Sequence, residues 1–270
     1  MKKILLINFI FCLSLPCLLF SKQLTDTTII PISAHLISLD IQNNIYAVDQ
    51  NQRIIKFRQT GEKLNFYQNN RLGRVQQIDV ANPHKILVFY PQQQTIVFLD
   101  RNMTEISRIE LNQFNIPEIS TAGMSNDNQV WIFDEFDNVL KKMDGSGNVR
   151  SISENTIGLW GHSLQPHLIH ERFNRVFLLD KNKGIFIFDN QGNPLQEVTL
   201  SRIEDFSVFN ANNLILNHRE EGIGFYRLSE ERFTPLDLPE ELTNINILQM
   251  RIQGNNILLR TVDELIFISQ

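Results

Sequence analysis

The sequence predicts an all-β protein: a six-bladed β-propeller of four-stranded antiparallel blades, closed into a ring by an N-terminal strand that completes the last blade. Three observations carry this prediction. A motif of two short apolar runs, each followed by a turn, recurs with a period of about 42 residues, within the range of propeller blades. The apolar runs do not alternate with polar residues. The chain holds 19 phenylalanines and 5 alanines, a balance that favours strands over helices.

The motif is clearest at residues 43–61 (NNIYAVDQNQRIIKFRQTG), 128–147 (NQVWIFDEFDNVLKKMDGSG) and 174–192 (NRVFLLDKNKGIFIFDNQG). Runs such as VWIF, VFLL and IFIF are too short to be recognised as helices. A strand with one solvated face would alternate apolar and polar residues, so these runs are predicted to be strands buried on both faces. A propeller blade is covered on both faces by its neighbours, which explains the pattern.

Weaker copies at residues 84–103, 212–231 and 255–270 bring the number of units to six. One register position ends the first strand of each copy: Asp49, Tyr90, Asp134, Asp180, Asn217 and Arg260. We expect the Asp and Asn side chains to cap the following turns rather than to form a calcium array, because their oxygens accept hydrogen bonds from the turn backbone. Gly61, Gly147 and Gly192 stand where the next turn requires a positive φ.

Each unit has a further apolar segment before the motif, and most have one after it, which gives four strands per blade. The sixth unit ends after its third strand, whereas TTIIPIS (residues 27–33) belongs to no unit. We therefore predict that residues 27–33 complete the sixth blade and close the ring. Pro31 suits this place because proline is tolerated mainly at the edge of a sheet.

The segments between the units predict the domain organisation and the longest loops. No Pro-, Gly- or Ser-rich linker interrupts the repeats, so residues 23–270 are predicted to form one domain. The long connections are residues 112–120, between blades two and three, and residues 156–167, between blades three and four. PEELTNI (residues 239–245) is predicted to be a single helical turn.

Residues 1–22 are predicted to be a signal peptide. Two lysines precede an apolar stretch over residues 4–20, and Ser21 offers a small residue for cleavage. This predicts secretion across the inner membrane to a periplasmic or outer-membrane associated location, with no transmembrane domain after cleavage. A retained anchor and a lipidated Cys17 are the alternatives. Cys12 and Cys17 both lie in this segment, so the mature chain is expected to have no disulfide.

The charge balance argues against a nucleic-acid partner. The chain has 25 basic and 30 acidic residues, a net charge of −5. Removing the predicted signal, with its three lysines, leaves 22 basic residues and a net charge of about −8. Nucleic-acid binding depends on neutralising phosphates with basic side chains.

The phrasing D-x-x-x-x-I-x-x-F-D-x-x-G resembles six-bladed β-propellers of the NHL and TolB-like type. The resemblance covers essentially the whole mature chain and implies the architecture. It leaves the function open, because such propellers include ligand binders, lactone hydrolases and assembly scaffolds.

Enzymes of this fold that are similar to gluconolactonase and regucalcin hold a divalent cation, such as calcium, at the mouth of the central channel. Their ligands are Glu, Asn and Asp side chains of the inner strands. The matching candidates here are Glu118, Glu204 and Asp205, with Gln76, Gln77 and Gln249 as neutral ligands. A hard cation needs several converging oxygens, whereas the same segments of blades one and four offer His35 and His167.

The segment GHSLQPHLIH (residues 161–170) raises a second metal hypothesis. His167 and His170 are three residues apart on a predicted strand, so we expect them on opposite faces and unable to bind one metal together. His162 and His167 would need a third ligand from elsewhere. A surface or channel-lining role is the simpler interpretation.

We predict a non-enzymatic cell-envelope propeller without a cofactor, which acts as a protein-interaction scaffold or as an accessory subunit of an envelope complex. Its expected partner is an envelope or outer-membrane protein. The candidate binding residues are Trp160, His162, His167 and Phe114. Trp160 is either an exposed anchor in a binding loop or a packed side chain between blades. The alternative function is a metal-dependent, lactonase-like hydrolase, or a small-ligand binder that uses the channel mouth.

Overall fold

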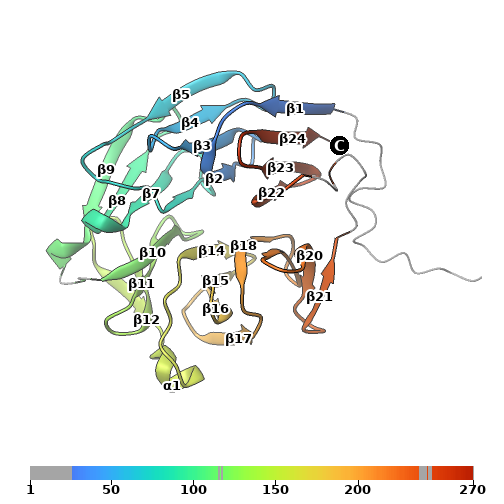
Figure 1. Cartoon of the computed structure of the whole chain (residues 1–270). Helices are drawn as coiled ribbons and strands as arrows, with labels where there is room; N and C mark the ends of the chain where they lie inside the picture. Colours follow the sequence, from blue (N-terminus) through green and yellow to red (C-terminus); the bar gives the residue numbers. More distant parts are fainter. Residues whose placement is uncertain (1–25, 115, 117, 237–241, 243–244, 270) are drawn as a thin grey trace, which may run out of the picture.

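The structure is a computed structural model and describes residues 26–114, 116, 118–236, 242 and 245–269. Its strands form six separate four-stranded antiparallel sheets arranged in a ring (Figure 1). The predicted fold class, a six-bladed β-propeller, is therefore confirmed. Figure 1 shows β2, β14, β18 and β22 toward the middle of the ring and β5, β9, β17 and β21 at its periphery.

Blades one to three are formed by consecutive strands. Blade one contains β2 (Ala34–Leu39), β3 (Ile45–Asp49), β4 (Ile54–Phe57) and β5 (Lys63–Tyr67). Blade two contains β6 (Gln77–Asp79), β7 (Ile86–Tyr90), β8 (Thr95–Leu99) and β9 (Glu105–Glu110). Blade three contains β10 (Ile119–Met124), β11 (Val130–Asp134), β12 (Val139–Met143) and β13 (Val149–Ile152).

Blades four and five repeat this order, and blade six has only three consecutive strands. Blade four contains β14 (Leu168–Arg172), β15 (Arg175–Asp180), β16 (Gly184–Asp189) and β17 (Pro194–Val198). Blade five contains β18 (Ile203–Val208), β19 (Asn213–His218), β20 (Gly222–Arg227) and β21 (Arg232–Pro235). Blade six contains β22 (Gln249–Gln253), β23 (Asn256–Arg260) and β24 (Leu265–Ser269).

The N-terminal strand closes the ring as predicted. β1 (Asp26–Ile30) pairs antiparallel with β24 along its whole length, from Asp26 opposite Ser269 to Ile30 opposite Leu265. It is the fourth, outermost strand of blade six. Pro31 lies directly after the strand rather than within it, so it ends the strand, where it has no ladder hydrogen bond to remove.

The core is a ring of apolar clusters, each shared by two neighbouring blades. Tyr46 of blade one and Val88 of blade two belong to one cluster, and Trp131 of blade three and Phe186 of blade four belong to another. Every residue of β7 and β8 is buried. Cover from both sides is the physical reason why the apolar runs do not alternate.

Most of the predicted turn positions are confirmed. Oδ1 of Asp49 accepts hydrogen bonds from the backbone N–H groups of Asn51 (2.8 Å) and Arg53 (2.9 Å). Asp134 and Asp180 cap their turns in the same way. Gly61, Gly147 and Gly192 have φ angles of +81°, +86° and +93°.

The prediction for Asn217 is wrong. β19 extends one residue further, to His218, and Nδ1 of His218 accepts the backbone N–H of Glu221 at 3.1 Å. Nδ2 of Asn217 donates instead to the carbonyl oxygen of Leu248, at 2.8 Å, in the segment that leads into blade six. Because the strand is longer, the turn is capped one residue later, by His218, and Asn217 connects blade five with blade six.

One predicted loop contains a helix. α1 (Thr156–Trp160) begins after Asn155, whose side chain accepts the N–H groups of Ile157 and Gly158, and ends at Gly161 with φ +78°. An Asn before and a Gly after are the local signals of such a helix. The chain also forms two short 3₁₀ helices, η2 (Pro91–Gln93) and η3 (Leu111–Phe114).

Two predictions fall mainly outside the described residues. The predicted signal peptide, residues 1–22, lies entirely outside them, and so do residues 239–241 and 243–244 of the predicted helical turn. Among the residues that are described, no helix is long and apolar enough to cross a membrane.

Candidate functional site

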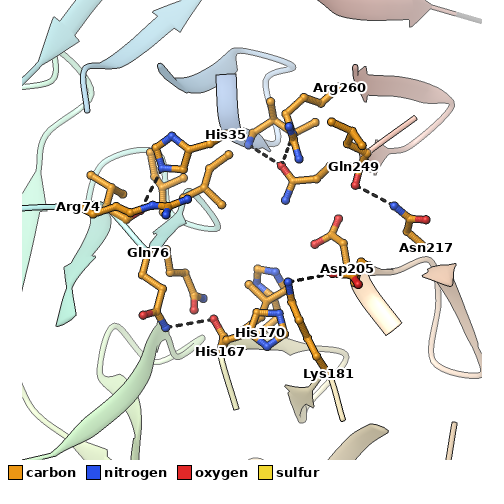
Figure 2. A pocket seen from close by; sticks show the side chains of 18 of the residues that line it. His35, Arg74, Gln76, His167, His170, Lys181, Asp205, Asn217, Gln249 and Arg260 are labelled. Carbon is orange, nitrogen blue, oxygen red and sulfur yellow. Dashed lines mark hydrogen bonds and ion pairs between the residues drawn. The ribbon is translucent and has the colours of Figure 1, made fainter. Parts of the chain in front are cut away.

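A cavity of about 730 Å³ lies at one mouth of the central channel (Figure 2). Its lining comes from blades one, two, four, five and six. The lining residues lie at the starts of inner strands and in the turns that follow the second strands. Because the strands are antiparallel, both kinds of segment meet at the same end of the ring.

β-Bulges bring extra side chains to this end. The register of β2 against β3 shifts between Ala34 and Leu36, and the register of β18 against β19 shifts between Ile203 and Asp205. A bulge lets adjacent residues depart from the alternation of a regular strand. His35 therefore lines the cavity from blade one, and Glu204 lines it from blade five together with Asp205.

The two carboxylates of blade five are held by protein cations. Asp205 forms a two-point contact with Arg251: Nη1 lies 2.5 Å from Oδ2, and Nη2 lies 3.0 Å from Oδ1. Glu204 accepts Lys181 Nζ at 3.1 Å and Arg219 Nε at 2.6 Å. Although burial by itself would raise the pKa of Glu204, the hydrogen bonds from Lys181 and Arg219 lower it overall.

The structure does not bring the three metal candidates together. Glu204 and Asp205 are adjacent in the cavity, whereas Glu118 is exposed in the segment that leads into β10 and does not line the cavity. In the described part of the chain, no three His, Cys, Asp or Glu side chains are close enough to hold a metal ion. A calcium site needs several converging oxygens, so this donor set does not fit one.

Two of the glutamines proposed as neutral ligands, Gln76 and Gln77, form hydrogen bonds between blades. Gln77 accepts Thr121 Oγ1 at 2.6 Å and donates to the carbonyl oxygen of Ile169 at 2.5 Å, so it connects blade two with blades three and four. Nε2 of Gln76 donates to the carbonyl oxygens of Ser120 and His167. These contacts join inner strands that are far apart in the sequence.

Blades six, one and two supply a cationic side of the cavity. Arg260 donates from Nε to Gln249 Oε1 at 2.8 Å and from Nη1 to the Ala34 carbonyl oxygen at 3.0 Å. His35 contacts the Val75 carbonyl oxygen through Nε2, at 3.2 Å. Burial lowers the pKa of His35, and the positive charges of Arg74 and Arg260 lower it further.

His167 and His170 both line the cavity, contrary to the expectation that they lie on opposite faces. His167 precedes β14, which begins at Leu168, so strand alternation does not relate the two side chains. Burial, followed by the charge of Lys181, lowers the pKa of His167 to about 4. Burial also places the pKa of His170 well below its ordinary value.

The lowered pKa of His167 predicts a loss of stability in mild acid. Between pH 6.5 and about 4 the unfolded chain binds a proton at this residue and the folded chain does not, so the free energy of unfolding falls as the pH falls through this window. The expected loss between pH 7.0 and about 4.5 is about 2.5 kcal/mol. Urea titrations at pH 7.0 and about 4.5 measure it.

The matched variants are His167→Gln and His84→Gln, because His84 is exposed. The difference in unfolding free energy between the two pH values should shrink by about 2.5 kcal/mol in H167Q. H84Q should keep the wild-type difference. Equal pH dependence in wild type and H167Q would contradict the assignment.

The other candidate binding residues lie away from the cavity. The Trp160 ring is half-buried, with its centroid 4.9 Å from that of Phe186 and 5.3 Å from that of Phe188. His162 also contacts Phe186, at 5.8 Å between ring centroids. Phe114 lies against Gly147 of blade three. The four residues therefore form no single cluster, and their role in binding stays a prediction.

Sequence reasoning missed two kinds of functional candidate. Phe136 and Ile157 are exposed by 75% and 47% and lie at the cavity end of blade three, where no motif marks them. Arg260 carries a signal in the repeat itself, because it stands at the register position where three other units have Asp.

The fold and the site define this chain as a six-bladed β-propeller with a polar cavity at its channel mouth. A chain in the crystal structure of a mitotic checkpoint complex is similar in fold, with a TM-score of 0.58 and 13% identity over 87% of this chain and 73% of that one. A catalytically inactive virginiamycin B lyase from Staphylococcus aureus, solved with quinupristin, has a TM-score of 0.58 and 10% identity over 91% of this chain and 100% of that one.

A streptogramin B lyase structure has a TM-score of 0.57 and 9% identity over 92% of this chain and 99% of that chain. At these identities the similarity concerns the fold alone. No family model matches the sequence, and no curated protein matches it.

Proposed function

We propose that this protein is a non-enzymatic binding propeller of the cell envelope, related to the NHL and TolB-like type, which docks a protein partner at the cavity end of its ring. It serves as a scaffold or accessory subunit of an envelope complex. The envelope location rests on the predicted signal peptide in residues 1–22. A rigid propeller suits this role because its connections present side chains on a fixed platform.

The exposed apolar pair of Phe136 and Ile157 is the observation that carries this proposal. The turn that holds Phe136 and the start of α1 are tied together: Asn155 Nδ2 donates to the Asp137 carbonyl oxygen at 2.6 Å, and the Thr156 N–H donates to the Asn138 carbonyl oxygen at 2.9 Å. These hydrogen bonds fix the two segments that carry the exposed apolar side chains, and fixed apolar side chains lose little conformational entropy when a partner binds.

The cavity chemistry supports binding over acid–base catalysis. A general base works best with a pKa near the working pH, whereas the pKa of Glu204 is lowered by its cationic partners. Asp205 is fixed in its contact with Arg251. Both carboxylates thus hold inner strands and neighbouring turns together at the channel mouth.

The test is affinity purification of the tagged full chain from its own envelope in mild detergent, read by mass spectrometry. Phe136→Asp should reduce recovery of a stoichiometric partner at least about tenfold, because a charge replaces an apolar anchor. Phe173→Asp is the matched control: Phe173 is 54% exposed but lies in the first turn of blade four, at the other end of the ring. Equal recovery with both variants would refute the docking surface.

A second candidate function is binding of a small ligand in the channel mouth. The observation in its favour is the cavity itself, because about 730 Å³ is a volume typical of small-molecule sites. The two functions use different side chains at the same end of the ring.

A further inference from the structure

The lining of the channel-mouth cavity has more cationic than acidic side chains. Its lining contains the cations Arg74, Lys181, Arg251 and Arg260 and the acids Asp180, Glu204 and Asp205. The ion pairs use Lys181 with Glu204 and Arg251 with Asp205. Asp180 caps its turn and has Lys183 at 4.0 Å. Within the described residues, Arg74 and Arg260 have no carboxylate at ion-pair distance.

Arg260 is a half-buried cation whose partners are neutral. Its Nε and Nη1 donate to an amide oxygen and a carbonyl oxygen, and Nη2 has no hydrogen-bond partner in the part of the chain that the structure describes. Burying an arginine without a counter-charge is unfavourable. An anion that enters the cavity would remove this cost, and a guanidinium group matches the geometry of carboxylate and phosphate oxygens.

The donors of this side of the cavity come from three consecutive blades. Arg260 and Gln249 belong to blade six, His35 to blade one, and Arg74 precedes the inner strand of blade two. Figure 2 shows His35 between Arg74 and Arg260. Gln249 uses Oε1 to accept Arg260 and the Ile37 N–H, which leaves its Nε2 donor toward the cavity without a partner among the described residues. The opposite side holds the paired acids.

We propose that the channel mouth binds a small organic anion through a carboxylate or phosphate group, with Arg260 and Arg74 supplying the positive charge and Gln249 a neutral donor. The cavity volume of about 730 Å³ leaves room for an organic body beside the charged group. This inference rests on the second candidate function and names its ligand class. It is independent of the protein-docking surface at Phe136.

The test is isothermal titration calorimetry on the purified full chain at constant ionic strength. The probes are succinate, a dicarboxylate, and glycerol 3-phosphate, a phosphate monoester; succinamide is the neutral analogue of succinate. We expect one or both anions to bind with a Kd below about 1 mM and succinamide to bind at least tenfold more weakly. Whichever anion binds more tightly identifies the charged group of the natural ligand.

Two variants locate the site. Arg74→Gln should weaken anion binding at least about tenfold, because a charge-assisted contact is lost. Arg71→Gln is its matched control, since Arg71 is also exposed but does not line the cavity, and it should bind like wild type. Arg260→Gln should abolish binding, and its thermal melting curve shows whether it is folded.

Three outcomes would overturn the proposal. They are the absence of binding by either anion at about 10 mM, equal binding of succinamide and succinate, and unchanged binding in R74Q. None of them affects the partner-recovery comparison of F136D with F173D. A failure of the anion site is therefore distinguishable from a failure of the docking surface.

Discussion

Deletion of residues 24–33 should lower the thermal midpoint of the propeller by at least about 10 °C, or abolish its cooperative transition. The deletion removes β1, which pairs with β24 along its whole length. It exposes the edge of β24 and removes Ile30 from the apolar cluster between blades six and one. An unpaired edge strand also promotes association between chains, so the deleted protein should aggregate more readily on heating.

A pair of point variants separates ring closure from chain shortening. Ile30 is 5% exposed, and Ile29, its neighbour on the same strand, is 57% exposed. Ile30→Ala should lower the free energy of unfolding by about 2–4 kcal/mol, because it leaves a cavity in a packed cluster. Ile29→Ala should change it by less than about 0.5 kcal/mol. Equal stability of the two variants, or an unchanged melting temperature after the deletion, would refute the closure by β1.

Asp134→Asn should lower the free energy of unfolding by about 3 kcal/mol. Oδ2 of Asp134 lies 2.6 Å from Lys141 Nζ, and the side chains are 2% and 10% exposed. Asn keeps the size and the oxygen that caps the turn at Phe136, so the variant removes mainly the charge. Asp137, at 2.7 Å from the same ammonium, is half-exposed and offsets only part of the loss.

Asp100→Asn is the matched control for this prediction. Asp100 caps its turn through the N–H groups of Asn102 and Thr104, both at 2.8 Å, and has no lysine partner among the described residues. Its substitution should cost less than about 0.5 kcal/mol. The double variant Asp134→Asn with Lys141→Met should recover most of the loss, because it removes the buried charge that lost its partner. Urea denaturation measures all three variants; equal costs for D134N and D100N would contradict a stabilising role of the ion pair.

The sequence predicts the role of a side chain where its partner lies within the same turn. Asp49 accepts the backbone N–H groups of Asn51 and Arg53 in the turn that it begins, so the repeat pattern is enough to predict its role. Asn217 stands at the same register position, but its partner is the carbonyl oxygen of Leu248 in the next unit. α1 also has local signals at its start, Asn155, and at its end, Gly161, but a helix of five residues is too short to show an apolar periodicity.

The sequence by itself determined the architecture of this protein. The period of about 42 residues, the apolar runs without alternation and the spare strand at residues 27–33 together specify six blades and the place where the ring closes. Each of these features depends on which residue types follow one another within a blade or on the count of strands. None of these features depends on contacts between side chains of different blades.

Only the tertiary structure decided how the charges of the channel mouth are paired. Asp205 and Arg251 are 46 residues apart, and they meet because the inner strands of blades five and six lie side by side. The same packing gives Glu204 its cations, and among the described residues it leaves Arg74 and Arg260 without a carboxylate at ion-pair distance. Ion pairing depends on separations of a few ångströms and on local burial, and these are set by the twist and stacking of neighbouring blades rather than by the order of residues in any one of them.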